Sequence, residues 1–131
     1  MWRIIYFRVK KPARRPVEEF LDSLQDDAEA KVFRNIQLLK EFGIDLGWPF
    51  VSNLGENLWE LRTKFKGNEY RVLFLPVPGK AFLLLHAFRK DTRRLPEHDR
   101  NLAVKRLAEY LRGGGKPDDD QRGQELPENE E

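Results

Sequence analysis

Cationic side chains recur at strand spacing in three apolar segments of the chain, residues 58–64, 70–75 and 82–90. Successive side chains of a strand point to opposite faces, so Arg62 and Lys64 share one face, as do His86, Phe88 and Lys90. Core strands rarely hold Lys or Arg, because burying an unpaired charge is costly. Each cation therefore needs an acidic partner, water or a bound phosphate, and the pattern indicates a sheet face that binds a polyanion.

Arg71 shares its predicted face with two leucines of the same strand. A plain surface arginine would leave those leucines exposed, whereas an arginine in a cleft can grip a phosphate through its bidentate, permanently charged guanidinium. The alternative is a structural ion pair with Glu60 or Glu69. Arg62 has the same alternative, because Glu60 lies two residues away on the same face. Both interpretations can hold together.

His86 is one of two histidines, and its ordinary pKa of about 6.5 suits acid or base chemistry near neutral pH. Its apolar neighbours are equally typical of a buried histidine bonded to a carbonyl. Phe88 could stack on an RNA base or belong to the core. Other cations could contact RNA around the cleft or simply keep turns soluble: Lys64, Lys66, Lys90, Arg93 and Arg94. The two histidines and scattered carboxylates predict no metal site.

The charge of the chain is divided unevenly. Residues 1–112 hold 22 of the 24 Lys and Arg and 15 of the 22 Asp and Glu, which gives a body at +7 and a tail at −5. Such a basic body attracts phosphate backbones. We expect one domain at residues 1–112 and a disordered acidic tail at residues 113–131.

The composition also bounds the class of protein. There is no cysteine, no readable signal peptide and no apolar run near the roughly 20 residues of a membrane helix. These features predict a soluble cytoplasmic protein with neither a membrane nor a cofactor as partner.

The periodicity of apolar residues predicts the elements that position these side chains. We expect a strand at residues 2–9, a short helix from Pro16, a helix at about 27–42 ended by Gly43, and an ordered loop at 43–55. Strands follow at about 57–65, 69–76 and 80–89, and a last helix runs from Pro96 to Gly113. The predicted fold is α+β: a twisted antiparallel sheet with an N-terminal helix hairpin and the C-terminal helix on one face, and the cations on the other.

This order of elements, together with three motifs, resembles the RelE superfamily of toxins, and most closely its HigB-like, phage-derived branch. The motifs are Leu-Trp-Glu-Leu-Arg at 58–62, Tyr-Arg-Val-Leu-Phe at 70–74 and Leu-Leu-His-Ala-Phe-Arg-Lys at 84–90. The resemblance covers residues 2–112 and is carried by the order and spacing of the motifs.

The resemblance implies the toxin of a type II toxin-antitoxin system. Such a toxin is a ribosome-dependent, metal-independent endoribonuclease, in which a 2'-hydroxyl of the messenger RNA attacks the adjacent phosphate. Arg62 and Arg71 would hold that phosphate, with Lys90 as charge stabiliser or acid and His86 as a possible base. Its partners would be messenger RNA, the ribosome, a cognate helix-turn-helix antitoxin and, through that antitoxin only, operator DNA. The alternative is a degenerate toxin that binds RNA or the ribosome without cleaving.

Overall fold

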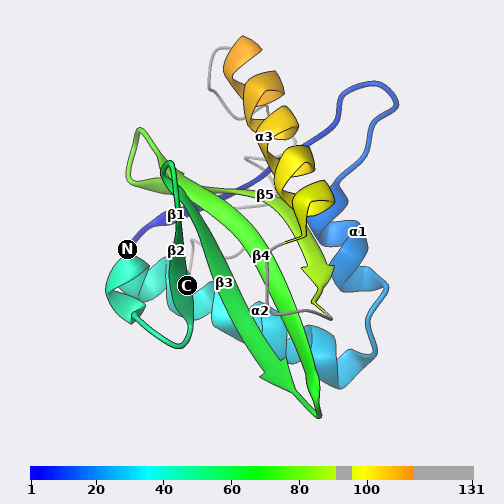
Figure 1. Ribbon diagram of the computed structural model, residues 1–131, viewed down its shortest axis with the longest axis vertical. Helices are drawn as coiled ribbons and strands as arrows, with labels where there is room; N and C mark the ends of the chain where they lie inside the picture. The colour runs from blue at the N-terminus through cyan, green and yellow to red at the C-terminus, as the bar shows by residue number, and fades with distance from the viewer. Residues whose placement is uncertain (91–95, 114–131) are drawn as a thin grey trace.

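The computed structural model describes residues 1–90 and 96–113 of the chain. The elements follow in the order β1 (Arg3–Tyr6), α1 (Pro16–Asp22), α2 (Asp26–Phe42), the 3-10 helix η1 (Gly43–Leu46), β2 (Val51–Gly55), β3 (Leu58–Phe65), β4 (Asn68–Val77), β5 (Ala81–Arg89) and α3 (Glu97–Arg112). Five strands form one sheet in the order β1-β5-β4-β3-β2 (Figure 1). The α+β class is confirmed.

The sheet is mixed, so the prediction of an antiparallel sheet is wrong for one pair of strands. β1 runs parallel to β5, while the other three neighbouring pairs are antiparallel. Parallel neighbours need a long connection between them, and here the chain passes through two α-helices, a 3-10 helix and three strands before β5 returns beside β1.

Hairpin turns connect β3, β4 and β5 into an antiparallel meander and set its register. Lys66 and Gly67 join β3 to β4 in left-handed backbone conformations, with φ of 50° and 79°. Two residues with positive φ match the twist of the flanking strands, which is the geometry of a tight hairpin. The pairing of Arg62 with Arg71, and of Arg71 with Phe88, follows from this register.

The predicted loop at residues 43–55 holds two elements that the sequence pattern did not indicate. η1 covers Gly43–Leu46, and β2 covers Val51–Gly55 at the edge of the sheet beside β3. The strand carries Asn53 and Gly55, both residues typical of turns, and pairing with β3 outweighs that local preference. The pairing of β2 with β3 begins at Val51 and Leu61, so residues 62–65 of β3 extend beyond β2 at this edge of the sheet.

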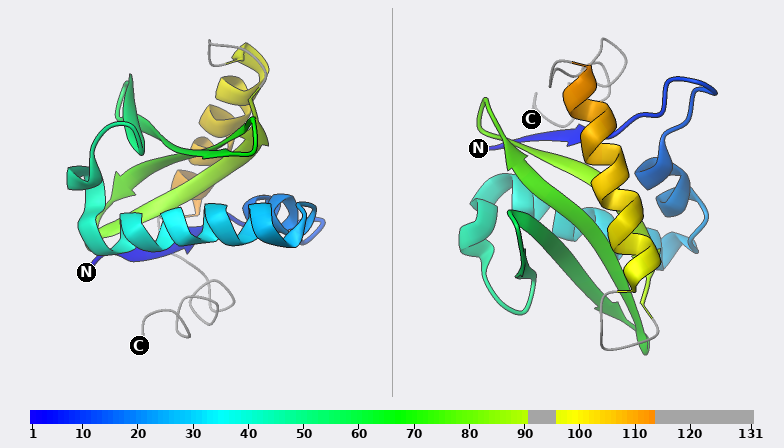
Figure 2. Two further views of the ribbon diagram at one scale, coloured as in Figure 1. Left: turned by 90° about the horizontal axis from the view of Figure 1, so that it is seen from below. Right: turned by 45° about the horizontal axis from the view of Figure 1, so that its top comes forward.

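The helices pack on both faces of the sheet, and the prediction that all three share one face is wrong. α1 and α2 cover a core that includes Ile4, Val72 and Phe74, whereas α3 covers a second core that includes Ile5 and Leu73. In the right-hand view of Figure 2, α3 crosses in front of β4 and β5 while α2 runs behind the strands. β5 is apolar on both sides and so can be sandwiched between the layers.

α1 and α2 do not form a clear hairpin. α1 has 7 residues and α2 has 17. Figures 1 and 2 show the axis of α1 turned across that of α2. α2 ends at Gly43, whose φ of 65° is in the left-handed region and where a Cβ would lie 2.6 Å from Nε1 of Trp2. Glycine therefore lets the chain turn against Trp2, which stacks on Phe82.

Two predictions lie outside the described residues: the disordered tail, apart from Gly113, and the RNA contacts of Arg93 and Arg94. Within the described ranges, none of the helices has both the length and the apolar character required to cross a membrane.

Candidate functional site

Four charged side chains from β3 and β4 form the centre of the candidate site, and we call them the arginine cluster: Glu60, Arg62, Glu69 and Arg71. Oε2 of Glu69 accepts a hydrogen bond from Nε of Arg62 at 3.1 Å and another from Nε of Arg71 at 3.1 Å. The Nη2 atom of each arginine also lies 2.9 Å from the same oxygen. Arg71 donates a further hydrogen bond through Nη1 to Glu60. The two arginines therefore converge on one carboxylate.

The cluster runs from the interior of the protein toward solvent. The side chain of Arg71 is 5% exposed and that of Glu60 is 7% exposed, while Arg62 is 11% and Glu69 is 20% exposed. Both ion pairs that the sequence left open for Arg71 are therefore present. For Arg62, the alternative was an ion pair with Glu60, and the structure pairs Arg62 with Glu69 instead. A phosphate that reached these arginines would have to compete with the carboxylate of Glu69.

Glu69 remains ionised at neutral pH. Burial acts to raise its pKa, but the charges and hydrogen bonds of Arg71 and Arg62 outweigh burial and hold the pKa below its ordinary value. A carboxylate with a lowered pKa is a poor proton acceptor. Glu69 is therefore suited to holding the two guanidinium groups in place rather than to taking a proton from a substrate.

Lys90 adds a third cation at the end of β5. Its backbone N–H donates to the carbonyl of Glu69 at 2.8 Å. Burial and the charge of Arg71 lower the pKa of Lys90, and they outweigh the opposite effects of Glu60 and Glu69. A lysine with a lowered pKa gives up its proton more readily than an ordinary lysine. The described part of the site thus carries three cations against two carboxylates.

His86 is held by α3 through both ring nitrogens. Nε2 lies 2.6 Å from Oδ1 of Asp99, and Nδ1 lies 3.0 Å from Nη1 of Arg106. Because a guanidinium can only donate, Nδ1 accepts from Arg106 and the neutral ring carries its proton on Nε2, toward Asp99. Burial lowers the pKa of His86 despite the opposing hydrogen bond to Asp99. In this arrangement neither nitrogen faces a substrate, so the geometry favours a positioning role over the predicted base.

Phe88 takes the core position that the sequence left as its alternative. Its ring is buried in the α3 core and stacks on His86, with 5.4 Å between ring centroids. A ring covered in this way does not present a face to an RNA base. Phe88 instead packs against the imidazole of His86 and helps to fix the orientation of that ring.

The two predicted RNA contacts at the end of β3 differ in their surroundings. Lys64 is exposed and borders a pocket at the open edge of β3. Lys66 forms an exposed ion pair with Asp27 of α2, with 2.9 Å between Nζ and Oδ2. Both side chains of this pair are exposed and screened by solvent, so Lys66 can exchange its partner for a phosphate at little cost.

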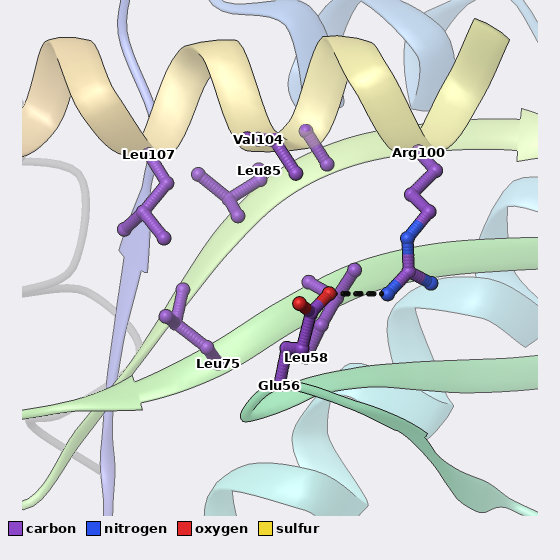
Figure 3. A pocket seen from close by; sticks show the side chains of 8 residues that line it. Glu56, Leu58, Leu75, Leu85, Arg100, Val104 and Leu107 are labelled. Carbon is purple, nitrogen blue, oxygen red and sulfur yellow. Dashed lines mark hydrogen bonds and ion pairs between the residues drawn. The ribbon is translucent and has the colours of Figure 1, made fainter. Parts of the chain in front are cut away.

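α3 is attached to the sheet at two levels beside His86. Arg100 extends from α3 to Glu56 in the β2–β3 turn, with 2.9 Å between Nη2 and Oε1 (Figure 3). Beside that pair, Leu58, Leu85 and Leu107 are among the side chains that line a cavity of about 40 Å³. A space of this size holds at most a water molecule. This contact therefore docks the helix and offers no ligand site.

The match to a protein family decides how this arrangement is classified. Residues 19–108 match the family model described as phage-derived protein Gp49-like. The chain belongs to the Gp49-like family. That family is associated with RelE-like toxins of toxin-antitoxin systems. A comparison with curated proteins gave no match.

The Gp49-like match includes every residue of the arginine cluster as well as Lys90, His86 and most of α3. The sequence pattern brought Arg62, Arg71 and Lys90 correctly to one face. It missed Asp99 and Arg106, because residues on a helix reveal their partner strand only through the tertiary fold.

Within the described ranges of this Gp49-like chain, no group of three or more His, Asp or Glu side chains lies close enough together to hold a metal ion. The arginine cluster and Lys90 supply guanidinium and ammonium groups. Such groups can bind phosphate oxygens and stabilise negative charge that develops on them.

Proposed function

We propose that the chain is the toxin of a type II toxin-antitoxin system, of the HigB-like branch, and that it cleaves messenger RNA on the ribosome. The observation that carries the proposal is the convergence of Arg62 and Arg71 on one carboxylate beside Lys90. Replacing buried ion pairs by apolar side chains is often neutral or stabilising, so stability alone is a weak reason to place these charges in a sheet. Membership in the Gp49-like family supports the same conclusion.

The proposed reaction needs no group beyond RNA, water and protein side chains. The 2'-hydroxyl of one ribose gives its proton to water and attacks the adjacent phosphate. The new P–O2' bond forms a cyclic phosphate on that ribose as the P–O5' bond breaks, which releases the 5'-hydroxyl of the next nucleotide. Arg62, the more exposed of the two arginines, binds the phosphate, while Arg71 holds the cluster in position and adds its charge. Lys90 stabilises the extra negative charge and donates a proton to the leaving oxygen, for which its lowered pKa is suited.

The partners follow from the same proposal. The toxin would act in the cytoplasm on ribosome-bound messenger RNA. A cognate antitoxin with a helix-turn-helix domain would bind the toxin and mask it. Operator DNA would be contacted only through that antitoxin. An adjacent reading frame for a small DNA-binding protein would support this pairing.

One observation favours the second candidate, a degenerate toxin that binds RNA or the ribosome without cleaving. Arg71 is nearly buried and is paired with two carboxylates, so its charge is already satisfied inside the protein. A binding module needs only the exposed cations at the rim of the cluster. The two candidates therefore differ in whether RNA is cleaved, but both bind RNA at the arginine cluster.

Growth arrest and RNA cleavage test the proposal with a matched pair of variants. Lys90 lies beside the arginine cluster, whereas Arg89 pairs with Tyr70, a residue of the opposite core. We expect Lys90→Ala to lose growth arrest and cleavage on translating ribosomes, and Arg89→Ala to retain both. Equal toxicity of Lys90→Ala and the parent would reject the assigned role of Lys90.

A further inference from the structure

An exposed tryptophan lies directly beside the arginine cluster and takes no part in the proposed chemistry. Trp48 is 71% exposed, and the guanidinium carbon of Arg62 lies 4.2 Å from the centroid of its ring. One face of the indole therefore covers Arg62, and so large an exposed fraction leaves the other face in solvent. Single exposed apolar side chains are common on protein surfaces, so the informative feature of Trp48 is its position over Arg62.

The guanidinium of Arg62 links this ring to the arginine cluster. It donates to Glu69 on one side and to the carbonyl oxygen of Pro49 at 3.3 Å on another, with Trp48 over its plane. These contacts hold Trp48 and Arg62 in a fixed relation. A base stacked on Trp48 would be placed next to a phosphate bound by Arg62.

A basic pocket continues from Arg62 along the open edge of β3. The pocket has a volume of about 180 Å³ and is lined by Lys31, Asn35, Pro49, Phe50, Arg62 and Lys64. It lies where β3 runs beyond the start of β2, so α2 supplies one wall and the segment before β2 supplies another. Lys31 and Lys64 are exposed and have no acidic partner in the described part of the chain. Their charges are available to a ligand.

The dimensions and chemistry of the pocket identify one class of ligand. Drug-sized molecules occupy about 300 to 1,000 Å³, so this smaller hollow fits a sugar-phosphate unit rather than a whole nucleoside phosphate. Cations that line a groove, next to an aromatic ring with one open face, are the two features that single-stranded nucleic acids require. Asn35 does not supply the specificity, because its amide already donates to Thr63 at 2.9 Å.

We propose that Trp48 stacks on a base of single-stranded RNA, and that Lys31 and Lys64 bind the backbone phosphate of the neighbouring nucleotide. This inference rests on the proposed function for its substrate class, and it adds a subsite at the β3 edge outside the reacting linkage. The RNA would run from the basic pocket across Trp48 to the arginine cluster. A protein partner that inserts a side chain beside Trp48 is the competing occupant.

Binding of a short RNA that cannot react tests the subsite separately from cleavage. The probe is a fluorescein-labelled hexanucleotide with 2'-O-methyl groups throughout, titrated with the full chain at low salt while anisotropy and tryptophan fluorescence are recorded. We expect RNA to quench tryptophan emission in the parent. Trp48→Leu should weaken binding about 5- to 150-fold, the range that corresponds to loss of one base stack, and Trp48→Tyr should recover most of it.

Variants of the two lysines test the phosphate contacts, and changes at two exposed residues elsewhere serve as controls. Lys31→Ala and Lys64→Ala should each weaken binding to all sequences and reduce the salt slope by about one. Phe33→Leu, an exposed aromatic on α2, and Lys105→Ala, an exposed lysine on α3, should bind as the parent does. Melting curves of Trp48→Leu and Trp48→Tyr that match the parent exclude a folding defect, since Trp48 is a surface residue.

The outcomes separate this inference from the proposed function. If Trp48→Leu binds RNA as tightly as the parent, the subsite is rejected. If that variant also loses binding to the antitoxin, Trp48 belongs to a protein interface. If the parent and Trp48→Leu cleave RNA equally, the proposed nuclease activity is retained and the subsite is rejected. If the parent binds RNA through Trp48 but never cleaves it, the subsite is supported and the proposed nuclease activity is rejected.

Discussion

Arg62 and Arg71 lie directly opposite each other across β3 and β4, and both donate to the same oxygen of Glu69. Like charges that face each other across a strand pair normally destabilise a sheet. Here the shared carboxylate offsets the repulsion and draws the two guanidinium groups together. Glu69 therefore controls how much positive charge this face presents.

Removal of the shared carboxylate should strengthen RNA binding at the expense of stability. In Glu69→Gln the two arginines keep their positions but lose the counter-charge, so we expect tighter binding of a short RNA and a salt slope steeper by about one. Unfolding free energy should fall by about 1 to 3 kcal/mol, because charged hydrogen bonds are lost. Glu97→Gln, an exposed change in α3, is the control. An unchanged slope would show that Glu69 does not screen the RNA-binding charges.

The buried pair of Arg71 and Glu60 separates structural from functional roles. Arg71→Met alone leaves Glu60 unpaired and should cost about 3 to 5 kcal/mol in urea unfolding. Adding Glu60→Leu should restore most of that stability, because an apolar pair fills the same space without buried charge. The double variant should remain unable to arrest growth. Growth arrest by a stable double variant would remove Arg71 from the site.

The burial of His86 should make stability depend on pH. The pKa of His86 in the folded protein is below its value of about 6.5 in the unfolded chain, so the unfolded state takes up more protons as pH falls through about 6.5. Stability is therefore complete above that pH and declines as pH falls toward the folded pKa. His86→Gln should reduce the difference in unfolding free energy between pH 7.5 and 5.5 (about one unit on either side of the unfolded pKa).

Lys105→Gln, an exposed change in α3, provides the control for this titration and should keep the pH dependence of the parent. The interpretation fails if His86→Gln also keeps it, or if stability of the parent rises between pH 7.5 and 5.5.

A buried lysine in α2 predicts a stabilising substitution. Lys40 is 2% exposed, and its Nζ is buried with no hydrogen-bond partner in the part of the chain that the structure describes. An unsatisfied buried polar group costs about 1 to 3 kcal/mol, so Lys40→Met should raise the unfolding free energy by a similar amount. Lys105→Met should change it by less than about 0.5 kcal/mol. Destabilisation by Lys40→Met would mean that the ammonium group is solvated in solution.

The sequence allowed much of the sheet to be predicted because its strands are regular. Alternation placed Arg62, Arg71 and Lys90 on one face, and positive-φ turn residues such as Gly67 set the register that brings them together. β2 could not be predicted, since its Asn and Gly favour a turn until β3 supplies a partner.

The position of α3 could not be predicted either, because both faces of β5 are apolar and either could receive a helix. Its placement on the cationic face depends on contacts between distant residues, such as Asp99 and Arg106 with His86. For the same reason His86 looked available for catalysis in the sequence, whereas both of its nitrogens are bonded in the fold. The pairing of Arg71 was visible as an alternative, but burial was needed to show that it holds.

Mapping of RNA ends on translating ribosomes tests the central claim most directly. Purified parent protein and Arg62→Ala would be added to ribosomes translating a defined message, and new ends would be located and examined for a 2',3'-cyclic phosphate. The parent should produce such ends at the codon in the ribosomal A site, and Arg62→Ala should produce few or none while melting as the parent does. Intact message in the presence of ribosome-bound parent protein, or equal cleavage by Arg62→Ala, would contradict the account.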